Sequence, residues 1–165
     1  MTQGTVETLK FIKNLTDISW SFAEKELERK LCELGCKVIE SVGHRKTFLL
    51  PNGLKANSYC EIDFSQIEID LDVFLEADEL DEAEYEKKLC EFQSRYEKTV
   101  SEAKSILGEP CFSGAFTDYN FPDDQDAINL TLWRQESVRF MVQLKHEGRE
   151  IPMRVTFVIT PMLEL

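Results

Sequence analysis

The sequence feature that most constrains the fold is a long apolar stripe at helical spacing in the middle of the chain. Its positions recur mostly every three or four residues, so a helix over residues 79–107 would place them on one face. Asp78 is predicted to cap this helix, and Gly108 and Pro110 are predicted to end it. The stripe consists of Leu80, Tyr85, Leu89, Phe92, Tyr96, Val100, Ala103 and Leu107. A helix with such a face must pack on another apolar layer, which the rest of the chain has to supply.

Alternating apolar and polar residues on both sides of this helix predict that the other layer is a β-sheet. Before the helix, short strands are expected at residues 38–39 and 47–50, and strict alternation runs over residues 59–75. After the helix, residues 112–126 are expected to be mostly loop, because they are rich in Asp, Asn, Gly and Pro. A three-stranded meander is expected over residues 128–159.

Two shorter helices are expected before the strands, over residues 6–15 and 21–35. The second has the clearer start, because Ser21 and Glu24 have the spacing of a capping box. The order of elements predicts an α+β fold, in which an antiparallel sheet carries the two amino-terminal helices and the long central helix on one face. No linker or repeat divides the chain, so residues 1–165 are expected to form a single domain.

Negative charge is concentrated in one stretch of the chain. Residues 61–91 hold thirteen of the 31 acidic residues but two of the 19 basic ones, and this stretch accounts for nearly all of the net charge of −12. Such a charge opposes binding to nucleic acid phosphates and to anionic membrane surfaces. A basic protein surface or a cation would be compatible with it.

A hairpin with its tip at residues 65–66 would place the first of these acids on one face of the sheet. Asp63 would then lie opposite Glu68, and Glu61 opposite Asp70. Like charges directly opposite each other destabilise a sheet, so a face of this kind indicates a docking surface for a basic partner. The predicted surface consists of Glu61, Asp63, Glu68, Asp70 and Asp72.

Two other interpretations of the acidic stretch stay open. The carboxylates form a solvated face that aids solubility, with the acids at the helix start complementing the helix dipole. Alternatively, Glu68, Asp70 and Asp72 present three oxygen donors to a divalent cation, although the spacing of an EF-hand and a nearby histidine are both missing.

A second candidate contact surface lies on the predicted meander. Trp133 falls in the opposite phase from Leu132, so it is expected on the polar side of its strand, together with Arg139. Tryptophan and arginine are enriched at interaction hot spots, and Arg134 and Met141 would extend the patch. The alternative is that a helix packs over this face and buries Trp133.

The chemistry-bearing motifs of common enzyme families are missing from the sequence. We find no phosphate-binding glycine loop, no nucleophile elbow and no zinc-protease motif. No cofactor is expected, and the chain is predicted not to be an enzyme. The five cysteines are odd in number and fall in apolar patterns, which suits a reducing compartment. No secretory signal or membrane-spanning run is apparent, so a cytoplasmic location is expected.

One segment near the amino terminus resembles a known class of small proteins. Ile18-Ser19-Trp20-Ser21, followed by Glu26-Leu27-x-x-Lys30-Leu31-x-x-Leu34-Gly35, is similar to the amino-terminal part of some immunity proteins found beside bacterial polymorphic toxins. The resemblance covers this segment and the general layout, and it carries no functional position over to this chain. It implies a non-catalytic inhibitor that covers the active cleft of a cognate toxin, often a cleft lined with Lys and Arg.

Three functions follow from these observations. The first is an acidic immunity protein that binds a basic toxin domain. The second is a secretion chaperone, usually a dimer, that holds an effector segment in an apolar groove. The third, less favoured, is a metal-dependent enzyme built on the same carboxylates.

Overall fold

The computed structural model describes the backbone of residues 3–162 and the side chains of residues 10–162. It contains two helices at the amino-terminal end, α1 (Gln3–Thr16) and α2 (Glu24–Glu33), and one long helix, α3 (Glu82–Leu107). A short 3₁₀ helix, η1 (Ala77–Glu79), precedes α3. Within these described residues, no helix is both long and apolar enough to cross a bilayer.

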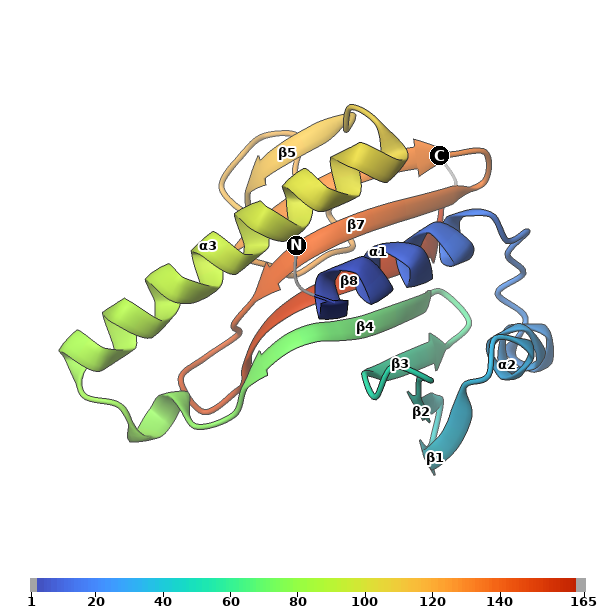
Figure 1. Ribbon diagram of the computed structural model, residues 1–165, viewed down its shortest axis with the longest axis horizontal. Coiled ribbons are helices and arrows are strands. Elements are labelled where there is room, and N and C mark those ends of the chain that lie inside the picture. Colours follow the sequence, from blue (N-terminus) through green and yellow to red (C-terminus); the bar gives the residue numbers. More distant parts are fainter. Residues whose placement is uncertain (1–2, 163–165) are drawn as a thin grey trace.

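The strands form one eight-stranded antiparallel sheet. Its spatial order is β1-β2-β3-β4-β8-β7-β6-β5, so β1 and β5 are the edges and β4 pairs with β8 near the centre. The strand bounds are β1 Lys37–Val42, β2 Arg45–Leu49, β3 Lys55–Cys60, β4 Ser65–Phe74, β5 Phe112–Ala115, β6 Asn129–Gln135, β7 Val138–Lys145 and β8 Met153–Pro161. The last three form the predicted meander. The chain leaves β4 through α3, reaches the far edge at β5, and returns strand by strand to close against β4 (Figure 1).

The helices pack on one face of this sheet, as the alternation and the apolar stripes predict. In Figure 1, α1 and α3 lie in front of the central strands and α2 lies near β1 and β2. Side chains from all three helices share one buried cluster with the strands; its fully buried members include Ile12, Leu15, Leu27, Leu31, Phe48, Phe92, Phe140 and Phe157. The predicted α+β fold with helices on one face is therefore confirmed.

The opposite face of the sheet has a smaller apolar cluster under a long loop. Leu130, Leu132, Met141 and Val158 are buried there, and Phe112 and Phe121 pack against them. The loop between β5 and β6 supplies Phe121, so this loop covers the face that carries no helix.

The start of α3 differs from the prediction. Ala77–Glu79 forms η1 and Leu80 is extended, so the helix begins later and Asp81, not Asp78, is its N-cap. The Asp81 side chain accepts a hydrogen bond from the Glu84 backbone N–H at 2.8 Å. The predicted end of α3 is confirmed, since Gly108 is the C-cap with a φ of 80°.

Two further sequence predictions are wrong at the level of elements. The N-cap of α2 is Ala23, which makes no side-chain capping bond, so Ser21 and Glu24 do not form a capping box. Part of the predicted loop is an edge strand, β5, which pairs with β6 from Phe112 opposite Leu132 to Ala115 opposite Asn129. Because β5 is four residues long and contains Gly114, it lacks an alternating apolar signal.

Candidate functional site

The predicted acidic hairpin has a different turn. β3 ends at Cys60 and β4 begins at Ser65, so residues 61–64 form the turn and residues 65–66 belong to a strand. The Glu61 backbone N–H donates to the Phe64 carbonyl oxygen at 2.7 Å and closes it. Glu61 and Asp63 are therefore exposed turn residues and do not lie opposite Asp70 and Glu68. In the observed register, Glu68 faces Asn57 and Asp70 faces Lys55.

A β-bulge separates the remaining three acids. Asp70 pairs with Thr156 of β8, whereas Asp72 pairs with its neighbour Val155, so one extra residue, Leu71, is accommodated in β4. The bulge turns Asp72 to the helix-covered face, where its carboxylate lies 3.5 Å from Arg95 of α3. The prediction that all five acids share one face is wrong. Burial is the main cause that raises the pKa of Asp72, and the charge of Arg95 offsets it in part.

Glu68 and Asp70 lie in a buried network of ion pairs. The Glu68 carboxylate is 3.0 Å from Lys145 Nζ and 3.4 Å from Arg154, and Arg154 also lies 3.5 Å from Asp70 and 3.1 Å from Glu147. Glu68 is 5% exposed and Lys145 is 7% exposed. Burial raises the pKa of Asp70, and the charge of Arg154 lowers it by less. These carboxylates are counter-ions within the protein and are closed to a large partner.

The same geometry bears on the metal-site interpretation. Glu68 already contacts two cationic side chains, and Asp72 lies across the sheet from Asp70. Among the residues that the structure describes, no group of three His, Cys, Asp or Glu side chains is arranged to hold a metal ion. The predicted set Glu68, Asp70 and Asp72 is thus not brought together as donors.

Six exposed acids of the acidic stretch lie at the junction of β4 and α3, apart from Glu61 and Asp63 in the turn before β4 and from Glu82, which pairs with Arg149. We call this region the acidic tip; it comprises Glu76, Asp78, Glu79, Asp81, Glu84 and Glu86. All six are exposed, and within residues 10–162 none of them forms an ion pair. Asp81 also serves as the N-cap of α3, and burial is negligible there, so the backbone N–H of Glu84 is what lowers the pKa of Asp81.

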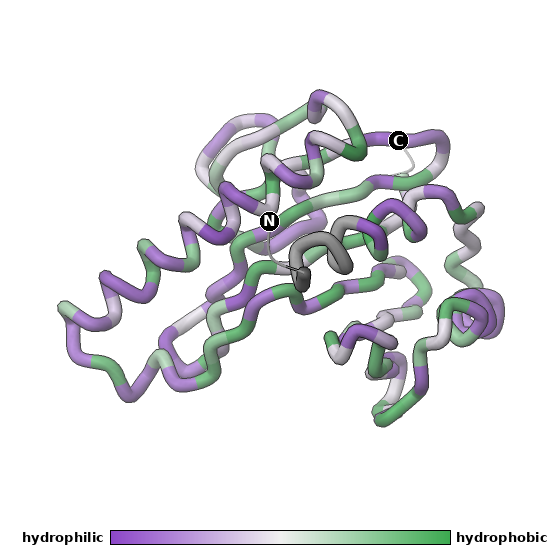
Figure 2. The backbone as a smooth tube through the Cα atoms, viewed as in Figure 1, coloured by the Kyte–Doolittle hydropathy of each residue, from purple (hydrophilic) through white to green (hydrophobic). Residues whose placement is uncertain are grey.

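Apolar side chains accompany the charge at the acidic tip. Val73 is 43% exposed, because the bulge places it opposite Arg154 on the face away from the main core. Leu75, which follows the last residue of β4, is 69% exposed. Beside them is a hollow of about 340 Å³ in which Lys88 lies over the Phe74 ring. It is lined by Phe74, Leu80, Glu84, Lys87, Lys88 and Glu91. Figure 2 shows hydrophilic and hydrophobic stretches alternating along this end of the chain.

Trp133 and Arg139 do not form the predicted contact patch. Trp133 pairs with Phe140 on the helix-covered face, is 3% exposed, and donates its indole N–H to the Gly108 carbonyl oxygen at 2.9 Å. The alternative, burial of Trp133 under a helix, is confirmed. Arg139 lies on the other face, opposite Arg134 in β6.

Arg139 is held by a loop residue that the sequence does not single out. Its guanidinium donates two hydrogen bonds to the Asp124 carboxylate, at 3.0 and 2.5 Å, and a third to the Pro161 carbonyl oxygen. Burial would raise the pKa of Asp124, but the hydrogen bonds and charge of Arg139 together outweigh it and hold that pKa below its usual range. Residue spacing cannot reveal this pair, because Asp124 comes from a loop without a pattern.

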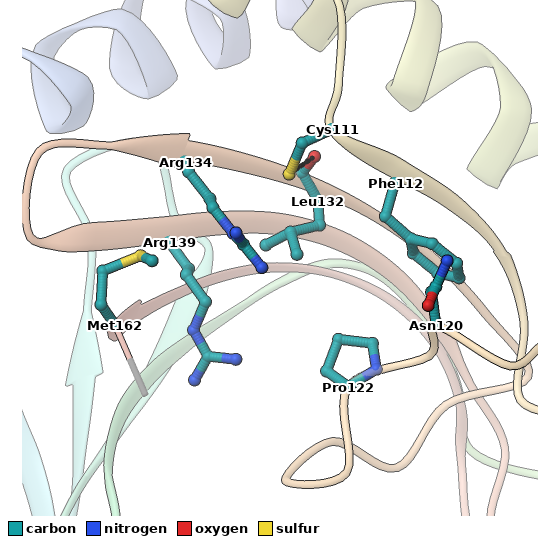
Figure 3. Close-up of a pocket in the computed structure, with 8 residues that line it drawn as sticks. All are labelled: Cys111, Phe112, Asn120, Pro122, Leu132, Arg134, Arg139 and Met162. Carbon is teal, nitrogen blue, oxygen red and sulfur yellow. Dashed lines mark hydrogen bonds between the residues drawn. The ribbon is translucent and has the colours of Figure 1, made fainter. Parts of the chain in front are cut away.

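Two hollows flank the ion pair between Arg139 and Asp124. One, of about 400 Å³, is drawn in Figure 3 and contains both Arg134 and Arg139. The other, of about 460 Å³, contains Asp63 as well as Arg139 and Asp124. Of the seven residues predicted to bind a partner, Asp63 and Arg139 are the two that line one hollow.

No family model, curated protein or solved structure matches this chain. Functional residues can therefore be argued from the geometry alone. The acidic tip gathers six exposed carboxylates at the junction of β4 and α3, and the hollow beside Arg134 and Arg139 is a second, chemically different feature.

Proposed function

We propose that the protein is a non-catalytic binding protein that neutralises a toxin in the cytoplasm by placing its acidic tip in the toxin's basic cleft. The observation that carries the proposal is the accessibility of the six tip carboxylates, while Glu68, Asp70 and Asp72 are paired with basic residues of the same chain. In this proposal the partner contacts the junction of β4 and α3, and not the hairpin surface that the sequence predicts.

The tip has both properties that a tight protein complex needs. Exposed charge of one sign accelerates encounter with a surface of the opposite sign. Apolar side chains that become buried on contact then slow dissociation, and the exposed side chains of Val73 and Leu75 supply them. A positively charged cleft would gain attraction and desolvated apolar contact at the same place.

Charge reversal at the tip tests the surface. The partner is captured from an extract of the source cell, purified, and titrated against the wild-type chain and the double variant Glu76→Lys, Glu79→Lys at low and at high salt. We expect the variant to bind at least about tenfold more weakly and with less dependence on salt. The matched control is Glu97→Lys, Glu109→Lys, which changes the charge equally on exposed residues away from the tip. Equal affinity of both variants would rule the tip out.

The inhibitory role needs a separate measurement. Expression of the captured partner alone should arrest growth, and co-expression of the wild-type chain should restore it. The tip variant should fail to restore growth, whereas the control variant should succeed. A partner that is harmless when expressed alone would leave a binding protein but refute toxin neutralisation.

A second candidate function is the secretion chaperone, and one observation favours it. The edge strand β1 is exposed along its whole length and carries the apolar side chains of Val38, Ile39 and Val42. An open strand edge of this kind can pair with an extended segment of another chain. Light scattering distinguishes the candidates: a dimer that captures an unfolded effector segment supports the chaperone, and a monomer that binds a folded domain supports the toxin inhibitor.

A further inference from the structure

A positively charged hollow lies at the turn between β6 and β7, in a chain whose net charge is −12. Arg134 and Arg139 are directly opposite each other on these strands. Both side chains enter the same hollow (Figure 3). Two like charges in this position destabilise a sheet unless something neutralises them.

The two arginines differ in how far they are neutralised. Arg139 is 3% exposed and its charge is matched by Asp124. Arg134 is exposed, and within the described residues it makes neither an ion pair nor a side-chain hydrogen bond. Among the described residues, the hollow therefore holds one positive charge without a counter-charge, with the guanidinium geometry that suits a planar anion.

The other walls of the hollow are mainly apolar. Leu132 forms part of it, and Phe112, Pro122 and Met162 line its sides. Phe112 is fixed by an edge-to-face contact with Phe121, whose ring centroid is 6.3 Å away. The side chain of Asn120 adds a neutral amide. A volume of about 400 Å³ lies within the range of small-molecule sites.

We propose that this hollow binds a small monocarboxylate with an apolar body, whose carboxylate pairs with Arg134 and whose body packs on Leu132, Phe112 and Met162. One free guanidinium matches one negative charge. A phosphate monoester would bring nearly two charges into a strongly acidic protein and leave one unmatched. This site and the acidic tip lie at opposite ends of β7, since Arg139 is near its first residue and Lys145, its last, contacts the network next to the tip. The proposal is therefore independent of the toxin-binding function.

Cys111 provides a direct reporter for the test, because it lines the hollow and is an exposed cysteine outside any disulfide. The rate at which iodoacetamide alkylates Cys111 is measured by peptide mass spectrometry as 3-phenylpropionate or octanoate is added. We expect at least one of these acids to slow Cys111 alkylation in a saturable manner. Cys32 and Cys90, exposed thiols elsewhere, should react at unchanged rates in the same sample.

Variants and matched ligands identify the contact. Arg134→Gln should weaken protection at least about tenfold, because a charge-assisted hydrogen bond is lost. This variant should fold normally, which urea unfolding checks, and Arg134→Lys should retain part of the binding. Arg45→Gln removes the same charge from β2 and should leave protection unchanged. The amide 3-phenylpropanamide should not protect.

Any one of four results would overturn the proposal. The first is that neither acid protects Cys111, and the second is that the neutral amide protects it as well as the acid does. The third is that Arg134→Gln binds like the wild type, and the fourth is that phenyl phosphate protects more tightly than both carboxylates.

Discussion

Lys145 and Glu68 form a buried ion pair at the centre of a network of charged side chains. Both side chains are buried, and Arg154 bridges Glu68 to Asp70 and Glu147. The carboxylate of Glu68 is thus tolerated in the sheet because two cationic groups surround it. Removing one of them would leave an excess of buried negative charge.

We expect Lys145→Met to lower the free energy of unfolding by about 3 kcal/mol, the usual cost of breaking a buried ion pair. Lys104→Met changes an exposed lysine at the end of α3 and should alter stability by no more than about 0.5 kcal/mol. Urea unfolding followed by circular dichroism measures both. A similar small effect of the two substitutions would show that the network is not stabilising.

The ion pair between Asp124 and Arg139 should stabilise the fold in a pH-dependent way. Because Arg139 holds the pKa of Asp124 below its ordinary value of 3.8, the ion pair stabilises the folded state above that value, and the stabilisation is lost as pH falls through the lowered pKa. We expect Asp124→Asn to cost about 2 kcal/mol at neutral pH. The difference from the wild type should shrink in urea titrations as pH falls below 3.8. A difference that stays constant with pH would contradict this role.

The first turn of α3 shows what a helix boundary depends on. Asp78 and Asp81 are both acidic residues just before a long apolar stripe, and the pattern alone does not distinguish them. The backbone decides, because η1 ends in an extended Leu80 and so delivers Asp81 to the N-cap.

Asp81→Ala should therefore destabilise the protein by about 1 kcal/mol, and Asp81→Ser should restore most of that loss. Asp78→Ala is the matched control and should stay within about 0.5 kcal/mol of the wild type. Thermal unfolding by calorimetry is a suitable measurement. If the two alanine variants lose equal stability, the capping bond of Asp81 is not the cause.

The strands were predictable where apolar and polar residues alternate regularly. They were not predictable where a turn or a bulge interrupts the regular strand backbone. The meander over β6, β7 and β8 and the long helix follow directly from their patterns. The turn before Ser65 and the bulge at Leu71 do not, because an apolar run such as Ile67, Ile69, Leu71 and Val73 looks the same with or without an extra residue. That one residue decides which face Asp72 occupies.

Over the whole molecule, the sequence shows how much charge is present but not which charges are already paired. Glu68 meets Lys145 and Arg154, which are 77 and 86 residues further along the chain. No local pattern connects such partners. The acidic tip differs from Glu68 in that its carboxylates take no part in these distant ion pairs among the described residues.

The exposed edge strand β1 is the contact that the secretion-chaperone candidate predicts between two copies. For that candidate, Ile39→Lys should raise the concentration at which the protein self-associates by about tenfold or more, because a charge on an edge strand opposes pairing. Ile62→Lys places the same charge on a fully exposed turn residue and should have no such effect. Sedimentation velocity over a range of concentrations measures both; identical behaviour of the two variants would exclude β1 as the contact.

The central position of β8 has a consequence for synthesis on the ribosome. β4 is made early and can pair with β3, but its second neighbour in the sheet and the arginine that neutralises Glu68 arrive only with β8. Until then, the nascent chain has an open strand carrying a carboxylate without that counter-charge. Folding is therefore expected to be committed late, in one step that joins the two halves, rather than progressively as the chain emerges.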